Sequence, residues 1–202
     1  ITPLGTIRVD LNLADKLIRE NSVFKSNASA FSNEHSLEVQ LPFLQYHLKK
    51  DFRIIPILIG TQNQTASKKI AEALIPYFTP ENLFIISSDF THYPDYQNAK
   101  IVDQLTADAI LTKSSEKFMI AISSNADKNI TNLSTSACAW PAILTLLYMV
   151  EKSREIEITR LDYQNSGDTK YGDKHRVVGY NALSVTMKKK SSPAVNEFSL
   201  SD

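Results

Sequence analysis

Asp89 and His92 are the pair of residues whose types and spacing point most directly to chemistry. They follow an apolar run, Leu83–Ser88, which predicts a buried strand. In open α/β sheets, sites form just beyond the carboxyl ends of the strands. A carboxylate and an imidazole placed there could act as catalytic residues, one orienting the other as a base, or could bind a metal. The structural alternative is that Asp89 caps a turn and His92 lies on the surface.

Cys138 is the second candidate, and it is the only cysteine of the chain. Pro141 has no N–H and fits the first turn of a helix, which places Cys138 at or just before the N-terminus of that helix. The positive end of the helix dipole favours a thiolate there, and a thiolate can be a nucleophile or a soft metal ligand. The alternative is a small buried residue beneath Trp140.

A third group begins a predicted helix that Asn33 caps and that runs from Glu34 to about Leu48. Pro42 inside this helix predicts a kink or a helix in two parts. Glu34 and Glu38 share one face of this helix, and His35 lies beside Glu38. Acidic side chains suit a helix N-terminus, so helix stability alone could explain the pattern. A histidine and two acids could also converge on a site.

The composition limits the classes of function. Lys+Arg and Asp+Glu both number 22, so no overall charge would attract nucleic acid or an anionic membrane. No apolar run approaches the roughly 20 residues that span a bilayer. The single cysteine favours a reducing compartment, and we expect a cytoplasmic protein. The five glycines form neither a dinucleotide-binding fingerprint nor a P-loop.

The periodicity of apolar residues predicts strands that alternate with helices. The predicted strands are 6–9, 52–59, 83–88, 156–165 and 176–187, and the predicted helices are 11–21, 34–48, 65–78, 98–111, 115–123 and 139–151. The last two strands alternate polar and apolar residues and predict an antiparallel pair. This order predicts an α/β fold, a three-layer α/β/α arrangement with a mixed sheet. We expect residues 188–202 to be a linker and the possible start of a following domain.

Six segments, in order across about residues 1–187, together resemble the Memo-like family, which is component B of the Ammecr/Memo/radical-SAM trio. They are Thr2–Gly5, Glu34–Glu38, Ile55–Gly60, Ser87–His92, Ser136–Pro141 and Ser166–Tyr180. The family is similar in fold to the LigB-type extradiol dioxygenases, which use non-haem iron. The resemblance implies that residues 1–187 are the C-terminal portion of a Memo/LigB-like domain.

The resemblance also implies roles for the residues above. Cys138 matches the family's metal-ligand cysteine, and Asp89 and His92 match pocket residues beside it. Glu34 and His35 match the helix-start motif near the same vestibule.

Trp140 lies near the presumed pocket and is a further candidate pocket residue. The family's two metal-binding histidines lie before the Thr2–Gly5 segment and are absent from this sequence. Non-haem iron takes about three protein ligands, so we do not expect this segment alone to bind Fe(II) tightly.

Three functions follow as hypotheses. The first is an iron-binding or metal-dependent redox protein, with Cys138 and histidines from the missing half as ligands. The second is a non-catalytic module that binds a peptide or partner and acts with a radical-SAM protein. Residues Glu197–Asp202 resemble the start of component A, so a fused component A domain is a possible partner. The third is a hydrolase using Cys138, His92 and Asp89.

Overall fold

The computed structural model describes residues 1–188 of the chain, and it confirms the α/β class. The predicted linker and domain start therefore lie, apart from residue 188, outside the described residues. The strands are β1 (Arg8–Val9), β2 (Arg53–Ile54), β3 (Ile156–Asn165) and β4 (Gly179–Met187). The helices are α1 (Leu11–Glu20), α2 (Leu41–Leu48), α3 (Gln64–Leu74), α4 (Tyr96–Leu111), α5 (Ser115–Asp127) and α6 (Trp140–Val150). Single 3₁₀ turns lie at Ala28–Phe31, Ile75–Tyr77 and Ser166–Asp168.

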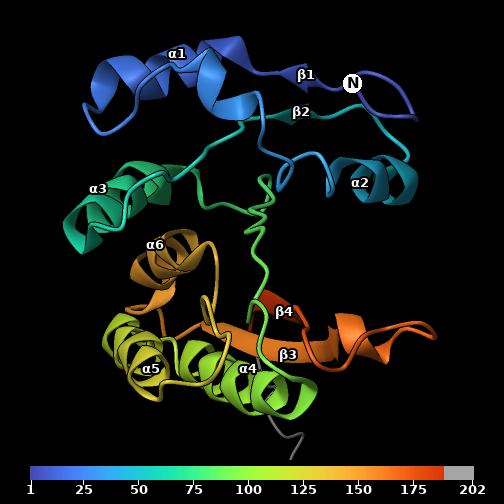
Figure 1. Ribbon diagram of the computed structural model, residues 1–202. Helices are drawn as coiled ribbons and strands as arrows, with labels where there is room; N and C mark the ends of the chain where they lie inside the picture. Colours follow the sequence, from blue (N-terminus) through green and yellow to red (C-terminus); the bar gives the residue numbers. More distant parts are fainter. Residues whose placement is uncertain (189–202) are drawn as a thin grey trace, which may run out of the picture.

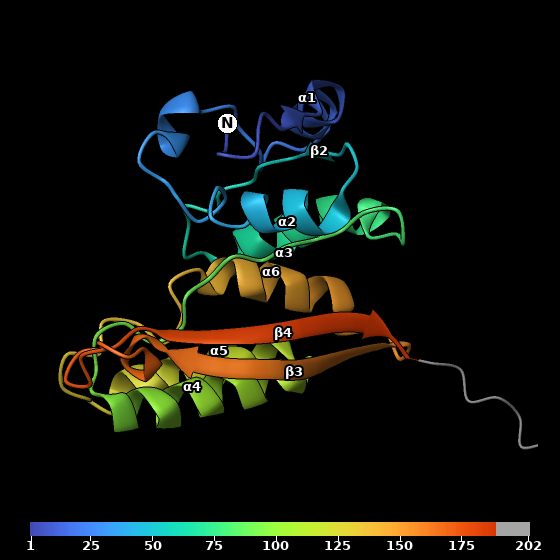
Figure 2. The same ribbon diagram turned by 90° about the vertical axis from the view of Figure 1, so that its right-hand side faces the viewer.

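The strands form two separate sheets, a parallel pair β1–β2 and an antiparallel pair β3–β4. In Figures 1 and 2, α6 lies on one side of the β3–β4 pair, and α4 and α5 lie on the other. Helix α3 packs against α6; β1, β2 and α1 form the far end of the molecule, and α2 lies at the level of α3. The expected arrangement of three layers around one mixed sheet stays a prediction.

The β3–β4 pair has the antiparallel arrangement that the alternating pattern predicts. Its register pairs Ile156 with Met187 at one end and Asn165 with Gly179 at the other. Strand β3 begins and ends where the sequence predicts, whereas β4 begins three residues later than expected, at Gly179. The residues before Gly179 belong to the loop that returns the chain toward residues 90–93.

Two apolar segments that were predicted as strands have little or no strand structure. Only Arg53–Ile54 of the segment 52–59 pairs as a strand, and Leu83–Ser88 has no strand structure. Their apolar side chains still pack: Ile55, Ile57, Ile59 and Phe84 surround a cluster of buried residues in α1 and α3. Within residues 1–188, however, no backbone hydrogen bond pairs residues 83–88 with another strand. The apolar pattern therefore indicates burial correctly, while strand structure also needs a partner.

The predicted helix start at Glu34 is wrong, because α2 begins at Leu41. Residues 36–40 form turns instead. Pro42 explains the difference, since proline is tolerated in the first turn of a helix but not in its interior. Glu34 and His35 consequently lie in an irregular segment before the helix.

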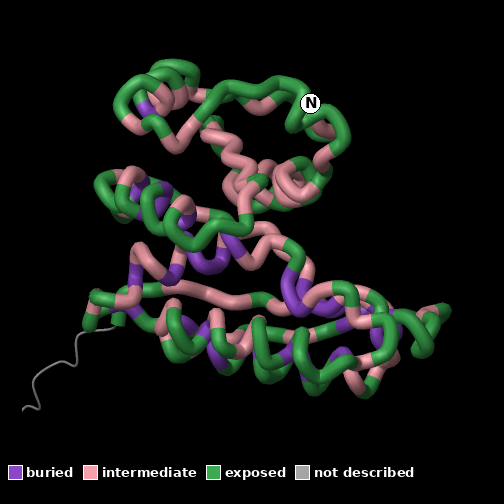
Figure 3. The backbone as a smooth tube through the Cα atoms, turned by 60° about the vertical axis from the view of Figure 1, so that its left-hand side comes forward, coloured by how far each residue is buried: buried purple, intermediate pink, exposed green. Residues whose placement is uncertain are grey.

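The main core lies between α4, α5, α6 and β3, where Phe118, Leu144 and Leu147 are fully buried. Figure 3 shows buried residues concentrated in this part and in α3, while the β1–α2 region is mostly exposed or half-buried. Leu17 is the only buried residue before residue 67 within the described range. No helix in residues 1–188 is both long and apolar enough to cross a bilayer.

Truncation of Leu144, which has no exposed surface, tests the position of this core. We expect Leu144→Ala to lower the free energy of unfolding by about 2–5 kcal/mol, because it leaves a cavity among well-packed side chains. Leu161→Ala is the matched control, since Leu161 is 66% exposed, and it should cost no more than about 0.5 kcal/mol. Urea unfolding followed by circular dichroism measures both. Equal losses in the two variants would contradict this assignment of the core.

Candidate functional site

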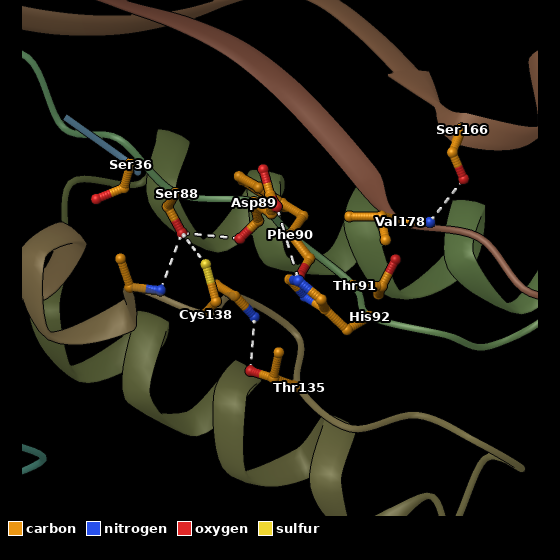
Figure 4. Close-up of polar contacts among 12 residues, drawn as sticks. Ser36, Ser88, Asp89, Phe90, Thr91, His92, Thr135, Cys138, Ser166 and Val178 are labelled. Carbon is orange, nitrogen blue, oxygen red and sulfur yellow. Dashed lines mark hydrogen bonds and ion pairs between the residues drawn. The ribbon is translucent and has the colours of Figure 1, made fainter. Parts of the chain in front are cut away.

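The candidate site is the extended stretch from Asp89 to His92, which the backbone holds between two other segments. His92 forms antiparallel bridges with both Thr135 and Val178, and its N–H donates to the Thr135 carbonyl at 3.1 Å. The N–H of Cys138 donates to the Asp89 carbonyl at 3.1 Å. The structure therefore places Cys138 next to the stretch that contains Asp89 and His92 (Figure 4).

The Asp89 and His92 side chains, three positions apart in the sequence, face each other. His92 Nε2 lies 3.6 Å from Asp89 Oδ2, which is an ion-pair distance and too long for a good hydrogen bond. The other ring nitrogen, Nδ1, lies 3.2 Å from the Phe90 carbonyl oxygen. A carbonyl can only accept, so this contact requires a proton on Nδ1. Nε2 is then the ring nitrogen that faces Asp89.

Cys138 lies immediately before α6, as the position of Pro141 predicted, and its thiol is exposed. Ser88 connects this helix start to the extended stretch. Its Oγ accepts the N–H of Ala139 at 3.1 Å, donates to the Asp89 carbonyl at 2.8 Å and lies 3.8 Å from Cys138 Sγ. Sequence reasoning did not single out Ser88, because its role depends on a contact between distant segments.

Glu34 and His35 do not contact Asp89, His92 or Cys138 through any hydrogen bond or ion pair of the described residues. The Glu34 carboxylate accepts the N–H of Ser36 at 2.6 Å, and this hydrogen bond lowers the pKa of Glu34 below its ordinary value.

Gln40 does connect the same irregular segment to the site, because its Nε2 donates to Ser87 Oγ at 3.1 Å. Trp140 is half-buried and packs against the main core, so packing alone accounts for its position. The expected pocket roles of Glu34, His35 and Trp140 stay predictions.

Two hollows on the described surface lie away from this site. One is bordered by α5 and by Tyr148 of α6, and the other lies beside β1 and Arg53 of β2. Neither is lined by Asp89, His92 or Cys138.

The donor atoms at the site suit a transition metal in type but not in number. Thiolate and imidazole are ligands for iron and zinc, and a carboxylate can join them. Within residues 1–188, however, no group of three or more His, Cys, Asp or Glu side chains is placed to hold a metal ion. Iron does not fit the described residues as a complete site, since non-haem iron takes about three protein ligands.

Asp103 is a residue of this region that sequence reasoning missed. It lies on α4 with no exposed surface, and its carboxylate accepts the N–H of Thr91 at 2.9 Å. The signal in the sequence was an acid on the apolar face of a helix. The buried residues of that face are Ala99, Val102, Asp103, Thr106, Ala107, Ala109 and Ile110.

The burial of Asp103 predicts a dependence of stability on pH. Loss of hydration raises its pKa above the ordinary value, and hydrogen bonds from Thr91 and Tyr163 only partly oppose this. A raised pKa in the folded state means that folding favours the protonated acid. Its contribution to stability is therefore fully present below the ordinary aspartate pKa of about 3.9 and is lost as pH rises through the folded value.

We therefore expect the free energy of unfolding of the parent protein, relative to Asp103→Asn, to decrease as pH rises above about 3.9 and then to level off. Urea unfolding of both proteins over a series of pH values measures the difference. A difference that stays constant, or that grows in favour of the parent, would contradict the raised pKa.

Comparison with known proteins gives a consistent family. The model of the family described as "Memo-like protein" matches residues 1–184. A MEMO1 family protein of Methanosarcina mazei is 37% identical over 187 residues, which cover 91% of this chain and 66% of the relative. The MEMO1 family protein Ta0237 of Thermoplasma acidophilum is 36% identical over 90% of this chain and 64% of its own length. The chain thus spans slightly less than two thirds of the length of these relatives.

Proposed function

The chain belongs to the Memo-like family, and from this premise we propose that it forms one side of a metal-dependent redox site. In this proposal Cys138 is a ligand of Fe(II), and Asp89 and His92 line the pocket beside it. The observation that carries the proposal is the hydrogen bond from the Cys138 N–H to the Asp89 carbonyl, at 3.1 Å. It fixes the only thiol of the chain next to the only Asp–His ion pair of the described residues.

The position of Cys138 supports a role as ligand. Its thiol is exposed at the start of α6, where it can reach a metal ion held by other parts of the domain. The remaining ligands would be the two family histidines, in the part of the domain that relatives have beyond the match. Iron bound by such a set supplies redox chemistry, and tight binding would need both parts.

The Asp89–His92 pair supports a role in handling protons or substrate. Because the Phe90 carbonyl occupies Nδ1, the ring presents Nε2 toward Asp89 and the open side of the site. The Asp89 carboxylate lies 3.6 Å from Nε2, so the pair presents an imidazole nitrogen and a carboxylate side by side to a bound molecule. Neither side chain is fully buried, and both remain accessible to a bound molecule.

Replacement of Cys138 tests the metal proposal, in protein that spans the full length of the family domain. We expect Cys138→Ala to weaken Fe(II) binding by at least about 10- to 100-fold. Loss of a residue that only hydrogen-bonds to a metal ligand already costs this much, and here a direct ligand is removed. Iron content and equilibrium dialysis measure this. The control is His175→Ala, which removes an exposed histidine outside the site and should leave iron binding unchanged. Equal iron content in Cys138→Ala and parent protein would exclude Cys138 as a ligand.

A partner-binding module is the second candidate, and Tyr93 is the observation that favours it. Tyr93 has a φ of 76°, which is unusual for an aromatic residue, and its ring is exposed. The Arg176 guanidinium lies 4.0 Å from the centre of this ring, and the His92 ring meets it edge to face. Exposed aromatic and arginine side chains are enriched where proteins recognise partners. The partners in this proposal are a radical-SAM protein and a component A domain.

Tyr93→Ala tests this candidate by pull-down with the radical-SAM and component A proteins of the trio. We expect at least a tenfold loss of affinity, since an aromatic anchor of an interface contributes about 2 kcal/mol or more. Tyr171→Ala is the control, because Tyr171 is 87% exposed and lies in the loop between β3 and β4. No association in the parent protein, or equal association in both variants, would argue against this role.

The hydrolase hypothesis has less support. A cysteine hydrolase needs its thiol within hydrogen-bond reach of the base. The polar neighbour of Cys138 Sγ among the described residues is Ser88 Oγ, and no hydrogen bond connects the thiol to His92.

A further inference from the structure

Thr91 is one of the two residues between Asp89 and His92, and both of its donors make hydrogen bonds in the interior. Its N–H donates to Asp103 Oδ1 at 2.9 Å, and its hydroxyl donates to Asp103 Oδ2 at 3.1 Å. Thr91 and Asp103 have no exposed surface. One carboxylate on α4 thus holds the backbone and the side chain of the central residue of the candidate site.

The same carboxylate is also held from β3. The Tyr163 hydroxyl donates to Asp103 Oδ2 at 2.9 Å, and Asn165 Nδ2 donates to the Tyr163 oxygen at 3.3 Å. Both Asp103 oxygens therefore have donors, and Tyr163 restricts the carboxylate to one orientation. These hydrogen bonds offset part of the free energy that burial of the Asp103 carboxylate costs. The remaining cost suggests that the acid has a role at this position.

The space around the carboxylate is closed by Gly179, the first residue of β4. A Cβ added there would lie 1.9 Å from Asp103 Oδ2, so no other residue fits without displacing the carboxylate. Gly179 also exchanges backbone hydrogen bonds with the site: its N–H donates to the Thr91 carbonyl at 2.9 Å, and its carbonyl accepts the Phe90 N–H at 2.8 Å. The start of β4 and the acid of α4 together enclose Thr91.

We propose that Asp103 is a positioning residue for the Asp89–His92 pair and acts through Thr91, an inference that rests on the proposed role of this pair in a pocket beside Cys138. Two hydrogen bonds to Thr91 fix the backbone between Asp89 and His92. The distance between their side chains depends on that backbone, because the two residues are separated by only two others. Without the carboxylate, Thr91 would keep its backbone bond to Gly179 but would lose its anchor on α4.

Nuclear magnetic resonance of the purified protein without added metal tests this proposal. The ¹⁵N shift of His92 Nε2 is recorded with aspartate and with asparagine at position 89. The change in that shift on Asp89→Asn reports the contact of the pair. We expect this Asp89-dependent change in the parent protein, its loss in Asp103→Ala, and its retention in Asp103→Asn, because asparagine keeps a carbonyl acceptor for the Thr91 N–H. Amide exchange at Thr91 should accelerate by about tenfold or more in Asp103→Ala alone.

Thr106→Ala is the matched control. Thr106 lies on the same face of α4, has no exposed surface and bonds to Val102 and Asn125 instead of to the site. It should lower the thermal stability while leaving the Asp89-dependent shift intact. The same loss of that shift in Thr106→Ala and Asp103→Ala would show a general effect on folding and would overturn the proposal.

A second pair of variants gives the answer if Asp103→Ala does not fold. Thr91→Val removes only the hydroxyl that bonds to Asp103, and Thr91→Ser retains it. We expect the Asp89-dependent shift to shrink in Thr91→Val and to persist in Thr91→Ser. An unchanged shift in Thr91→Val would overturn the proposal. These nuclear magnetic resonance measurements need no metal. The positioning role of Asp103 can therefore fail while Cys138 still binds iron, and Cys138 can fail to bind iron while the positioning role holds.

Discussion

The structure around the candidate site depends on the backbone hydrogen bonds of one short stretch, Asp89–Tyr93. Residues 134–138 bind it through Thr135 and Cys138, and residues 177–179 bind it through Val177 and Gly179. Three segments that are distant in the sequence meet at this stretch. This stretch consequently places the start of α6 relative to the start of β4. It belongs to no helix or strand and forms only isolated bridges at His92.

The helices and the β3–β4 pair could be predicted from the sequence because their signals are local. Asp10, Asp95 and Ser114 each accept backbone N–H groups at the first turn of a helix. The sequence predicted strands at residues 52–59 and 83–88, and only Arg53–Ile54 forms one. The sequence could not reveal this, because a strand exists only when another backbone pairs with it. These segments have the apolar composition of central strands, and their side chains pack accordingly. The composition says nothing about whether a neighbour is present.

The candidate site divides in a similar way. Pro141 correctly predicted that Cys138 lies at the start of α6. Only the family resemblance placed Cys138 beside Asp89 and His92, because the strand predicted to end before Asp89 is not formed. Glu34 and His35 were misplaced because the helix was begun on the wrong side of Pro42.

Ser88 and Asp103 were missed for a different reason. Neither residue belongs to a recognisable sequence motif. The partner of Ser88 is Ala139, and the partners of Asp103 are Thr91 and Tyr163, all from distant parts of the chain. Roles of this kind follow from three-dimensional contact alone. A buried acid on an apolar helix face is the one warning that the sequence provides.

The fit between Gly179 and Asp103 has a consequence for how this protein can change over time. A lineage that places any side chain at position 179 must first shorten or move the acid at position 103, because both cannot occupy the same space. A lineage that loses the acid gains room at position 179 but leaves the Thr91 N–H and hydroxyl without acceptors. The side chains that these two positions can hold, far apart in the sequence and on different elements, therefore depend on each other.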